Sequence, residues 1–369
     1  MKRAKLALSV AAVSLGASLW AGAAQADITI ALAGPMTGSA AAYGEQTRAG
    51  VEAAVADINA KGGLLGQKVM LTVADDACDA KQAVAAANKL VSQNVAVVIG
   101  HICSGASIAA SNVYGEEGIL MISPTATSPQ FTERGLKNVF RVCGRDDQQG
   151  EVAAKLIADR FKGKKVAIVH DKQAYGQGLA DDVKRRLNAA GITEAVFTSI
   201  NAGEKDYSAL VTRLKSEGVD VLYYGGYDQE LGLIARQSAD QQFRPQIIGA
   251  DGIQPQSYWN IAGETAEGTL FTFSPDPQRN TAAKPVVEAM QAKNIRTDGF
   301  TLFAYAAVQT YAQAAQKANS VKPADVTKSL RANPFETVVG KLEFDDKGDL
   351  KQPGYVFWAW KNGDKVQVD

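Results

Sequence analysis

The stretch Gly100-His101-Ile102-Cys103-Ser104-Gly105-Ala106-Ser107 decides the fold that this sequence predicts. It follows an apolar run, residues 95–99, whose length and Val/Ile content are typical of a buried parallel strand. Ser104, with small residues behind it, is typical of the N-cap or first turn of a helix. A strand that leads directly into a helix start points free backbone N–H groups and a hydroxyl out of the sheet. Such a strand–helix junction has one of two roles: it serves only to cap the helix, or it binds an anion, for instance a small carboxylate.

The first 26 residues are typical of an export signal. The chain begins Met1-Lys2-Arg3-Ala4-Lys5, continues with an apolar segment over residues 6–20, and carries Ala24-Gln25-Ala26 before Asp27. This pattern predicts a secretory signal peptide over residues 1–26, cleaved after Ala26, and an exported mature protein. The apolar segment is short for a bilayer span, and no later run approaches the roughly 20 residues required, so we expect no membrane insertion.

Length, charge and motifs narrow the class of protein. Removing residues 1–26 takes away three of the 39 basic residues and no acidic ones, so 36 basic and 39 acidic residues remain. This balance argues against nucleic acid or an anionic membrane as partner. The remaining length exceeds one ordinary core, so we expect two domains. Because the chain has only two histidines and no Walker, H-E-x-x-H, G-x-S-x-G or post-strand G-x-G-x-x-G motif, we expect no metal and no cofactor.

Short β-branched runs alternate with helical patterns along most of the chain. The first half holds four such strands, residues 27–33, 69–74, 95–99 and 119–122. The alternation pauses at residues 140–147 and restarts with a strand over residues 165–170. Successive βα units form parallel sheets with right-handed crossovers. The sequence therefore predicts an α/β protein with two doubly wound parallel-sheet lobes.

The C-terminal part departs from this alternation. Residues 269–273 are the segment that we expect to lead the chain back towards the first lobe. Residues 340–344 and 355–360 predict two antiparallel strands around the turn Asp345-Asp346-Lys347-Gly348-Asp349. The turn lacks the spacing and the later Glu of a calcium-binding EF-hand loop, so we predict a solvated hairpin there.

The carboxyl ends of the predicted strands carry the candidate binding residues, because small molecules bind there in open α/β sheets. Ser104 and its backbone would receive a carboxylate. The Thr125 carbonyl, the Thr127 hydroxyl and the Asp251 carboxylate would receive an ammonium. Apolar walls with polar tips would come from three tyrosines, Tyr43, Tyr175 and Tyr227. Each residue alone has an ordinary structural role, so the prediction of a site for a small zwitterion depends on their shared location.

The three cysteines raise a pairing question and an alternative function. Cys78 and Cys103 follow neighbouring predicted strands at the same sheet edge, so a disulfide between them is geometrically reasonable, and Cys143 is expected to be reduced and buried. His101 and Cys103 also suggest a thiol nucleophile with an adjacent base. A bonded Cys103 would abolish that thiol-dependent enzyme, which titration of free thiols tests.

The chain resembles the periplasmic leucine/isoleucine/valine-binding proteins, which are the extracytoplasmic solute receptors of ABC importers. The matching segments, spread in family order over nearly the whole mature chain, are residues 55–63, 75–79, 100–104, 117–122, 168–173, 202–206, 223–227 and 346–350. The resemblance implies a type I periplasmic-binding-protein fold with a three-segment hinge that closes the lobes on a ligand. It places the N-terminal lobe at residues 27–145 plus 275–352 and the C-terminal lobe at residues 146–274 plus 353–369.

The resemblance also implies a set of ligand-binding residues. It assigns Ser104 to the ligand carboxylate, and Tyr227, Thr127 and the backbone of Thr125 to the amino acid head group. The side-chain pocket would be lined by Tyr43, Ile102, Cys103, Tyr175 and Phe300, and the family disulfide matches Cys78 and Cys103. Asp251 takes the position of the ammonium-binding acid, where the leucine-type members carry Glu. Its side chain is one methylene shorter, which could shift ligand position or preference.

The resemblance favours a non-catalytic, monomeric receptor that captures branched-chain aliphatic amino acids and delivers them to an inner-membrane ABC permease. A ligand sensor for another small amino acid or amide, reporting to a partner receptor, would have the same lobes. A neighbouring permease gene would favour the transport role.

Overall fold

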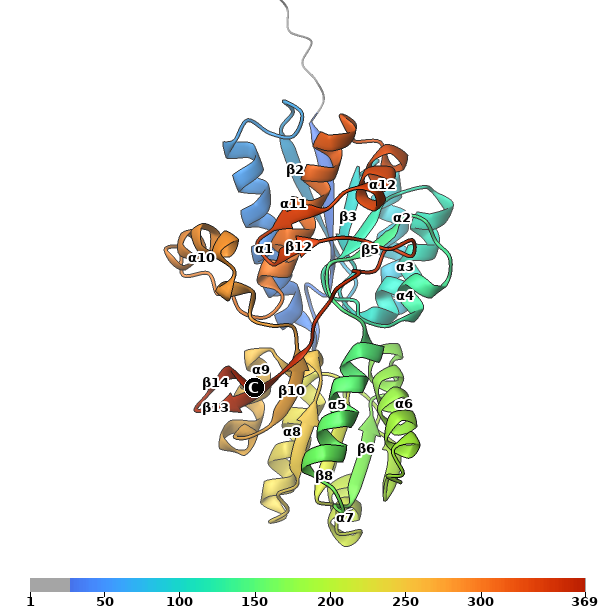
Figure 1. The fold of residues 1–369 in the computed structure, drawn as a ribbon, viewed down its shortest axis with the longest axis vertical. Helices are drawn as coiled ribbons and strands as arrows, with labels where there is room; N and C mark the ends of the chain where they lie inside the picture. Colours follow the sequence, from blue (N-terminus) through green and yellow to red (C-terminus); the bar gives the residue numbers. More distant parts are fainter. Residues whose placement is uncertain (1–26, 369) are drawn as a thin grey trace, which may run out of the picture.

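The computed structural model describes residues 27–368, so the predicted signal peptide lies outside the described residues. Two α/β lobes stand end to end, as expected, and the chain passes between them three times (Figure 1). Each lobe has its own sheet.

The N-terminal lobe is built on a five-stranded parallel sheet with the order β2-β1-β3-β4-β5. Its strands are β1 (Ile28–Gly34), β2 (Val69–Asp75), β3 (Val97–Gly100), β4 (Met121–Ser123) and β5 (Val139–Arg141). Helices cover both faces, and they are α1 (Ala41–Ala60), α2 (Ala80–Ser92), α3 (Ser104–Glu116), α4 (Gln130–Glu133), α11 (Thr301–Ala318) and α12 (Pro323–Ala332). The small helix α10 (Lys284–Gln291) and the ribbon of β11 (Phe335–Thr337) and β12 (Gly340–Leu342) complete the lobe.

Strand β1 shows why this sheet needs cover on both faces. Ile28, Ile30 and Leu32 pack into the core beneath α1 and α11, whereas Ala31 and Ala33 face the core beneath α2 and α3. Successive side chains of a strand point to opposite faces, so an apolar run without polar interruptions requires apolar partners on both sides.

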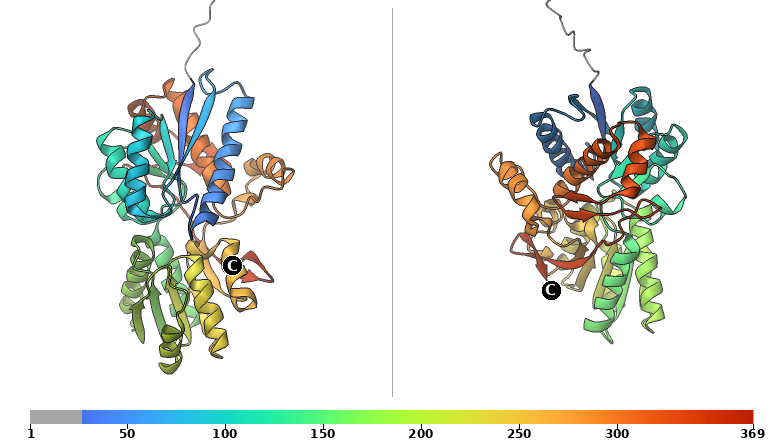
Figure 2. Two further views of the ribbon diagram at one scale, coloured as in Figure 1. Left: turned by 180° about the vertical axis from the view of Figure 1, so that it is seen from behind. Right: turned by 45° about the horizontal axis from the view of Figure 1, so that its top comes forward.

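The C-terminal lobe is built on a seven-stranded sheet with the order β14-β13-β10-β9-β8-β6-β7. Its strands are β6 (Val166–His170), β7 (Val196–Ser199), β8 (Val221–Gly225), β9 (Gln246–Gly249), β10 (Leu270–Phe273), β13 (Val356–Lys361) and β14 (Asp364–Val368). Its helices are α5 (Asp146–Arg160), α6 (Ala174–Ala189), α7 (Ser208–Ser216), α8 (Asp228–Asp240) and α9 (Gln256–Ala262). Strands β6 to β10 are parallel, whereas β13 and β14 run antiparallel at one edge (Figure 2).

One prediction about strand pairing is wrong, and one strand was not predicted. The runs at 340–344 and 355–360 do not pair with each other, because β12 pairs with β11 in the N-terminal lobe and β13 pairs with β10 and β14 in the C-terminal lobe. The sequence analysis also missed β5, a three-residue strand beside β4. Both errors have one cause: local pattern does not show which distant segment completes a short strand.

The acidic turn at residues 345–349 is also not wholly solvated. Asp349 is 2% exposed, and its carboxylate binds Arg141 Nε at 2.6 Å and Arg145 Nη1 at 2.6 Å. Arg141 is fully buried in β5 and also donates to the carbonyls of Ala126 and Ser128 at 2.6 and 3.0 Å. This ion pair therefore fixes one crossing segment against a loop at the carboxyl end of the sheet.

Candidate functional site

A small cavity lies between the two lobes, at the carboxyl ends of the strands of both sheets. Its volume is about 20 Å³. Nine of the ten residues predicted to bind ligand line it together with Gly252, and they are Tyr43, Ile102, Cys103, Ser104, Thr125, Tyr175, Tyr227, Asp251 and Phe300. The tenth, Thr127, is buried behind this wall, where its carbonyl accepts a hydrogen bond from the Asp146 amide at 3.0 Å.

The N-terminal lobe presents hydroxyls and a helix start to the cavity. Ser104 is the first residue of α3, with Cys103 as its N-cap, so the positive end of the helix points at the cavity. The Ser104 hydroxyl accepts a hydrogen bond from the Ser128 amide at 3.2 Å and keeps its proton for donation. The Thr125 hydroxyl donates to the Ile102 carbonyl at 2.6 Å, which ties two cavity loops together. This wall is suited to a carboxylate.

The C-terminal lobe presents an acid. Asp251 follows β9, is 3% exposed, and accepts a hydrogen bond from the Tyr175 hydroxyl at 2.6 Å. The Gly252 amide donates to the same hydroxyl at 2.7 Å. A Cβ on Gly252 would lie 2.8 Å from the Tyr175 ring, so only glycine lets the backbone approach so closely. Burial raises the pKa of Asp251, although the bond from Tyr175 opposes this shift. A cation would reverse the shift by stabilising the carboxylate.

Three tyrosines form an aromatic wall between the hydroxyl groups of the N-terminal lobe and Asp251 of the C-terminal lobe. The Tyr227 ring lies edge-on to Tyr43, with centroids 5.7 Å apart, and tilted against Tyr175 at 5.1 Å. Tyr43 comes from α1 in the N-terminal lobe, and its hydroxyl donates to the Gly252 carbonyl in the other lobe. Tyr43 therefore closes the cavity as well as lining it, a role that its sequence position did not predict.

The sequence analysis missed a second acid beside the cavity. Asp146 begins α5, is 2% exposed, and its Oδ1 accepts a hydrogen bond from Gln149 at 3.1 Å. Gln149 Oε1 accepts in turn from the Asp251 amide at 3.3 Å, so one amide side chain bridges the two acidic residues. The Asp146 Oδ2 has no hydrogen-bond partner among the described residues. Recognition of β5 would have predicted this residue, because Asp146 then follows a strand end.

The two carboxyl groups also influence each other. Burial and the nearby charge of Asp251 raise the pKa of Asp146 well above its usual value. Two buried acids this close to each other would favour binding of an ammonium, because a cation offsets both the repulsion between the carboxylates and the cost of burying them.

The cysteines are arranged as predicted. Cys78 and Cys103 form a disulfide with their Cα atoms 5.5 Å apart, which joins the loop after β2 to the loop after β3. Cys143 is a free, buried thiol whose pKa is raised by burial. Because the Cys103 sulfur is bonded, it offers no thiolate, and the nearby His101 binds Asp76 at 2.6 Å and Tyr114 at 2.9 Å instead. The arrangement does not support a thiol nucleophile.

A wider groove leads from solvent to the cavity. It measures about 720 Å³ and lies between the starts of α2 and α3 in one lobe and of α6 and α8 in the other. Tyr227 lines both the groove and the cavity, so its ring separates them. Within residues 27–368, no helix is both long and apolar enough to cross a membrane, and no three His, Cys, Asp or Glu side chains form a metal-binding group.

Two parallel-sheet lobes, three crossings and an enclosed cavity at the facing strand ends define a solute-binding protein of the periplasmic type. The sequence profile of the periplasmic binding protein family matches residues 27–364, and the chain belongs to this family. The predicted resemblance is thereby confirmed.

Similar proteins share the chain over nearly its full length. Leu/Ile/Val-binding protein homolog 1 of Brucella melitensis is 48% identical over 96% of this chain and 94% of its own. Leu/Ile/Val-binding protein BraC3 of Rhizobium johnstonii is 47% identical over 99% of this chain and 100% of its own.

Solved structures show the same fold. The leucine-binding protein LivK of Thermotoga maritima has a TM-score of 0.86 at 28% identity, over 93% of this chain and 98% of that one. A second structure is that of the branched-chain amino acid transporter substrate-binding protein LivJ of Streptococcus pneumoniae in complex with isoleucine. It has a TM-score of 0.85 at 26% identity, over 93% of this chain and 100% of that one.

Proposed function

We propose that this protein is a periplasmic receptor that captures leucine, isoleucine or valine between its lobes and delivers the amino acid to an ABC importer. One observation carries the proposal: a wall of hydroxyls and helix N–H groups on one lobe faces a buried acid on the other across an aromatic-lined cavity. These are the groups that the two poles of a zwitterion require. The relatives named above as Leu/Ile/Val-binding proteins support the ligand class.

Each pole of the ligand has its own set of groups. Ser104 and the first N–H groups of α3 bind the carboxylate. Asp251 binds the ammonium, with Asp146 adding negative charge beside it and the Thr125 carbonyl accepting a further hydrogen bond. The aliphatic side chain packs against apolar groups of the cavity, which are Ile102, Phe300 and the tyrosine rings. Thr127 acts through the Asp146 backbone.

Binding requires the lobes to part. The residues that line the cavity from both lobes are buried, among them Tyr43, Ser104 and Asp251, so the ligand enters only when the groove beside Tyr227 widens. The hinge would be the three crossing segments, with lobe boundaries at residues 145/146, 274/275 and 352/353. Cleavage after Ala26 would release the mature protein into the periplasm. The protein carries out no chemical reaction on its ligand.

Isothermal titration of the refolded, ligand-stripped protein against the twenty amino acids tests this function. Leucine, isoleucine and valine should bind with one site per chain, and glycine, aspartate and lysine should not. Binding of none of the aliphatic amino acids, or of a charged side chain in preference, would remove the proposal.

A further inference from the structure

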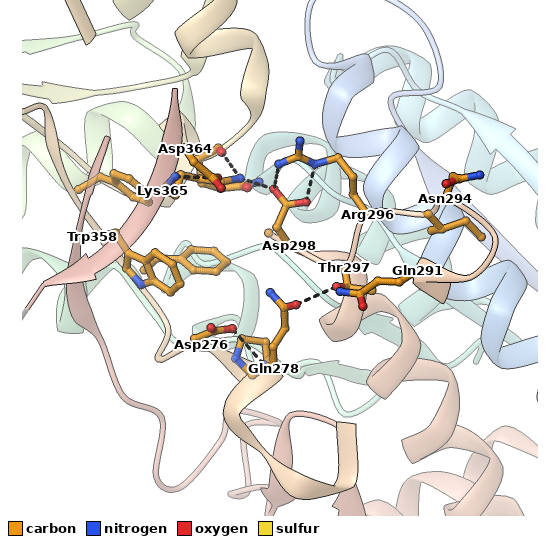
Figure 3. A pocket seen from close by; sticks show the side chains of 16 residues that line it. Asp276, Gln278, Gln291, Asn294, Arg296, Thr297, Asp298, Trp358, Asp364 and Lys365 are labelled. Atoms are coloured by element: carbon orange, nitrogen blue, oxygen red, sulfur yellow. Dashed lines mark hydrogen bonds and ion pairs between the residues drawn. The ribbon is translucent and has the colours of Figure 1, made fainter. Parts of the chain in front are cut away.

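A further hollow lies between the lobes, apart from the cavity and the groove. Helix α10 and the β13–β14 hairpin lie on this side of the molecule (Figures 1 and 2). The volume of the hollow is about 540 Å³. Phe271, Phe273 and Trp358 of the C-terminal lobe form one wall, and residues 291–299 of the N-terminal lobe form the other. The two lobes meet at one end of this hollow through charged side chains (Figure 3).

A buried lysine crosses between the lobes there. Lys365 of β14 binds the carboxylate of Asp298, and its Nζ also donates to the Gln254 carbonyl at 2.9 Å. The Lys365 side chain is only 6% exposed, and burial lowers its pKa even though Asp298 opposes the shift. Burial alone would raise the pKa of Asp298, but Arg296 and Lys365 hold it at about 2. The Asp298 carboxylate is therefore ionised at neutral pH, and Lys365 Nζ lies against it.

Arg296 provides an internal comparison. It holds the same Asp298 carboxylate with two hydrogen bonds of 2.9 and 3.1 Å, but it belongs to the same segment as Asp298 and its side chain is 61% exposed. Of the two cations on this carboxylate, only Lys365 joins the lobes.

A pair of amides adds a second link. Gln254 of the C-terminal lobe donates to Gln46 Oε1 of α1 at 2.8 Å, and Gln46 donates back to Gln254 at 3.3 Å. Gly299, at φ +61°, lies against both amides, and a Cβ there would collide with them. The next residue, Phe300, donates its amide to Gln46 at 3.1 Å and lines the ligand cavity. Through Phe300, the amide pair is thus connected to the wall of the ligand cavity.

We infer that the Lys365–Asp298 ion pair and the Gln46–Gln254 amide pair form an interlobe latch that stabilises the closed cleft and so determines how tightly ligand is held. Both links consist of protein atoms only, and both break when the lobes separate. Lys365 and Asp298 are positioning residues, because they act on the closed population and do not touch the ligand. Apparent affinity scales with the fraction of molecules in the binding-competent state.

The test compares Lys365→Met with Arg296→Met. Lys365→Met removes the interlobe link and leaves Asp298 paired with Arg296, so no buried charge is stranded. By small-angle X-ray scattering, the unliganded variant should have a larger radius of gyration than the unliganded wild type. Saturating leucine should make the radii of gyration of the two proteins equal. Leucine affinity should fall roughly tenfold, mainly through faster dissociation, which is the effect of losing a hydrogen bond to a charged group. Arg296→Met should stay within about twofold of wild type.

Further variants keep the inference testable if Lys365→Met folds poorly. Gln46→Ala removes the partly buried amide link and should shift scattering and affinity in the same direction by less. In the double variant Lys365→Met/Asp298→Asn, affinity should match that of Lys365→Met, since the pair acts as a unit. Unchanged scattering and dissociation in Lys365→Met and Gln46→Ala, or an equal effect of Arg296→Met, would overturn the latch.

The affinity measurements rest on the proposed function, but the scattering of unliganded protein does not. If the wild type binds no amino acid while Lys365→Met still expands the molecule, the ligand assignment fails and the latch stands. If the wild type binds leucine and Lys365→Met changes neither size nor dissociation, the latch fails alone.

Discussion

At the scale of single residues, the cavity depends on two buried acids whose hydrogen-bond partners are neutral. Asp251 receives a hydrogen bond from Tyr175, and Gln149 links its backbone to Asp146. Neither interaction supplies positive charge, and burial raises the pKa of both carboxyl groups. A bound ammonium would lower both pKa values, so the proposed site should favour a cation beside these acids.

Asp251→Asn tests this directly. The amide has the same shape but no charge, so leucine affinity should fall roughly 10- to 100-fold, the range for a hydrogen bond to a charged group. Titration calorimetry and the leucine-dependent shift of the melting temperature both measure the effect. Asp240→Asn, on an exposed acid at the end of α8, is the control and should bind like wild type. Unchanged affinity in Asp251→Asn would take this residue out of the site.

At the scale of elements, the cavity loops are positioned by links between strand ends. The disulfide joins the loops after β2 and β3, and the Ser123 hydroxyl of β4 donates to the His101 carbonyl at 2.7 Å. Arg141 of β5 holds the loop after β4 by its carbonyls. Each of these loops is therefore held by a bond to a neighbouring strand or loop, in addition to the helix that follows it.

Arg141→Met should destabilise the protein by about 3–5 kcal/mol, because it removes one partner of a buried ion pair and leaves buried carbonyls without a donor. Urea unfolding followed by circular dichroism gives the free energy. Lys347→Met, which removes an exposed ion pair with Glu133, should leave the free energy of unfolding close to that of the wild type, because solvent screens exposed pairs. Similar losses in both variants would show that burial of the Arg141–Asp349 pair has no special effect.

Removal of the disulfide in Cys78→Ser/Cys103→Ser should cost about 3.5 kcal/mol, the chain-entropy value for a loop of this length, which spans 25 residues of sequence. Cys143→Ser serves as the comparison, since it changes a buried thiol without opening a loop. Thiol titration after denaturation should find one free thiol in the wild type. Three thiols would contradict the pairing and restore the thiol-enzyme alternative.

At the scale of the whole molecule, several acids are buried at or near the strand ends of the C-terminal lobe. Burial raises the pKa of Asp171 to about 7 and that of Asp228 to about 6, and it raises those of Asp146 and Asp251 as well. A folded-state pKa above the unfolded value contributes stability that is present at low pH and lost as pH rises through the folded pKa. Each unit of such a shift corresponds to about 1.4 kcal/mol.

The melting temperature of unliganded protein should therefore fall as pH rises from 5 to 8. Below about pH 4 it should fall again, because acids with lowered pKa, such as Asp75 and Asp147, lose their partners on protonation. Saturating leucine should raise the melting temperature more at pH 8 than at pH 5, since the ammonium stabilises the charged carboxylates. Differential scanning calorimetry across this range measures both trends. A melting temperature that climbs steadily from pH 5 to pH 8 would contradict the buried-acid account.

The sequence by itself determined the two-lobed α/β architecture and most of the cavity wall. Uninterrupted Val/Ile runs such as Val97–Gly100 require apolar cover on both faces, and parallel topology then brings strand ends together at one edge. Ser104 and Asp251 follow strand ends of opposite lobes, so their meeting could be predicted without coordinates.

Only the tertiary structure decided which distant segments complete each other. Strand β5 is three residues long and contains Arg141, whose charge is paired with Asp349, 208 residues further along the chain. The pairing of β13 with β10 and β14, the place of Asp146 beside Asp251, and the contact of Lys365 with Asp298 have the same origin. Short-range patterns record local propensity and burial, whereas these contacts join segments far apart in the sequence, within a lobe for most of them and between the lobes for Lys365 and Asp298.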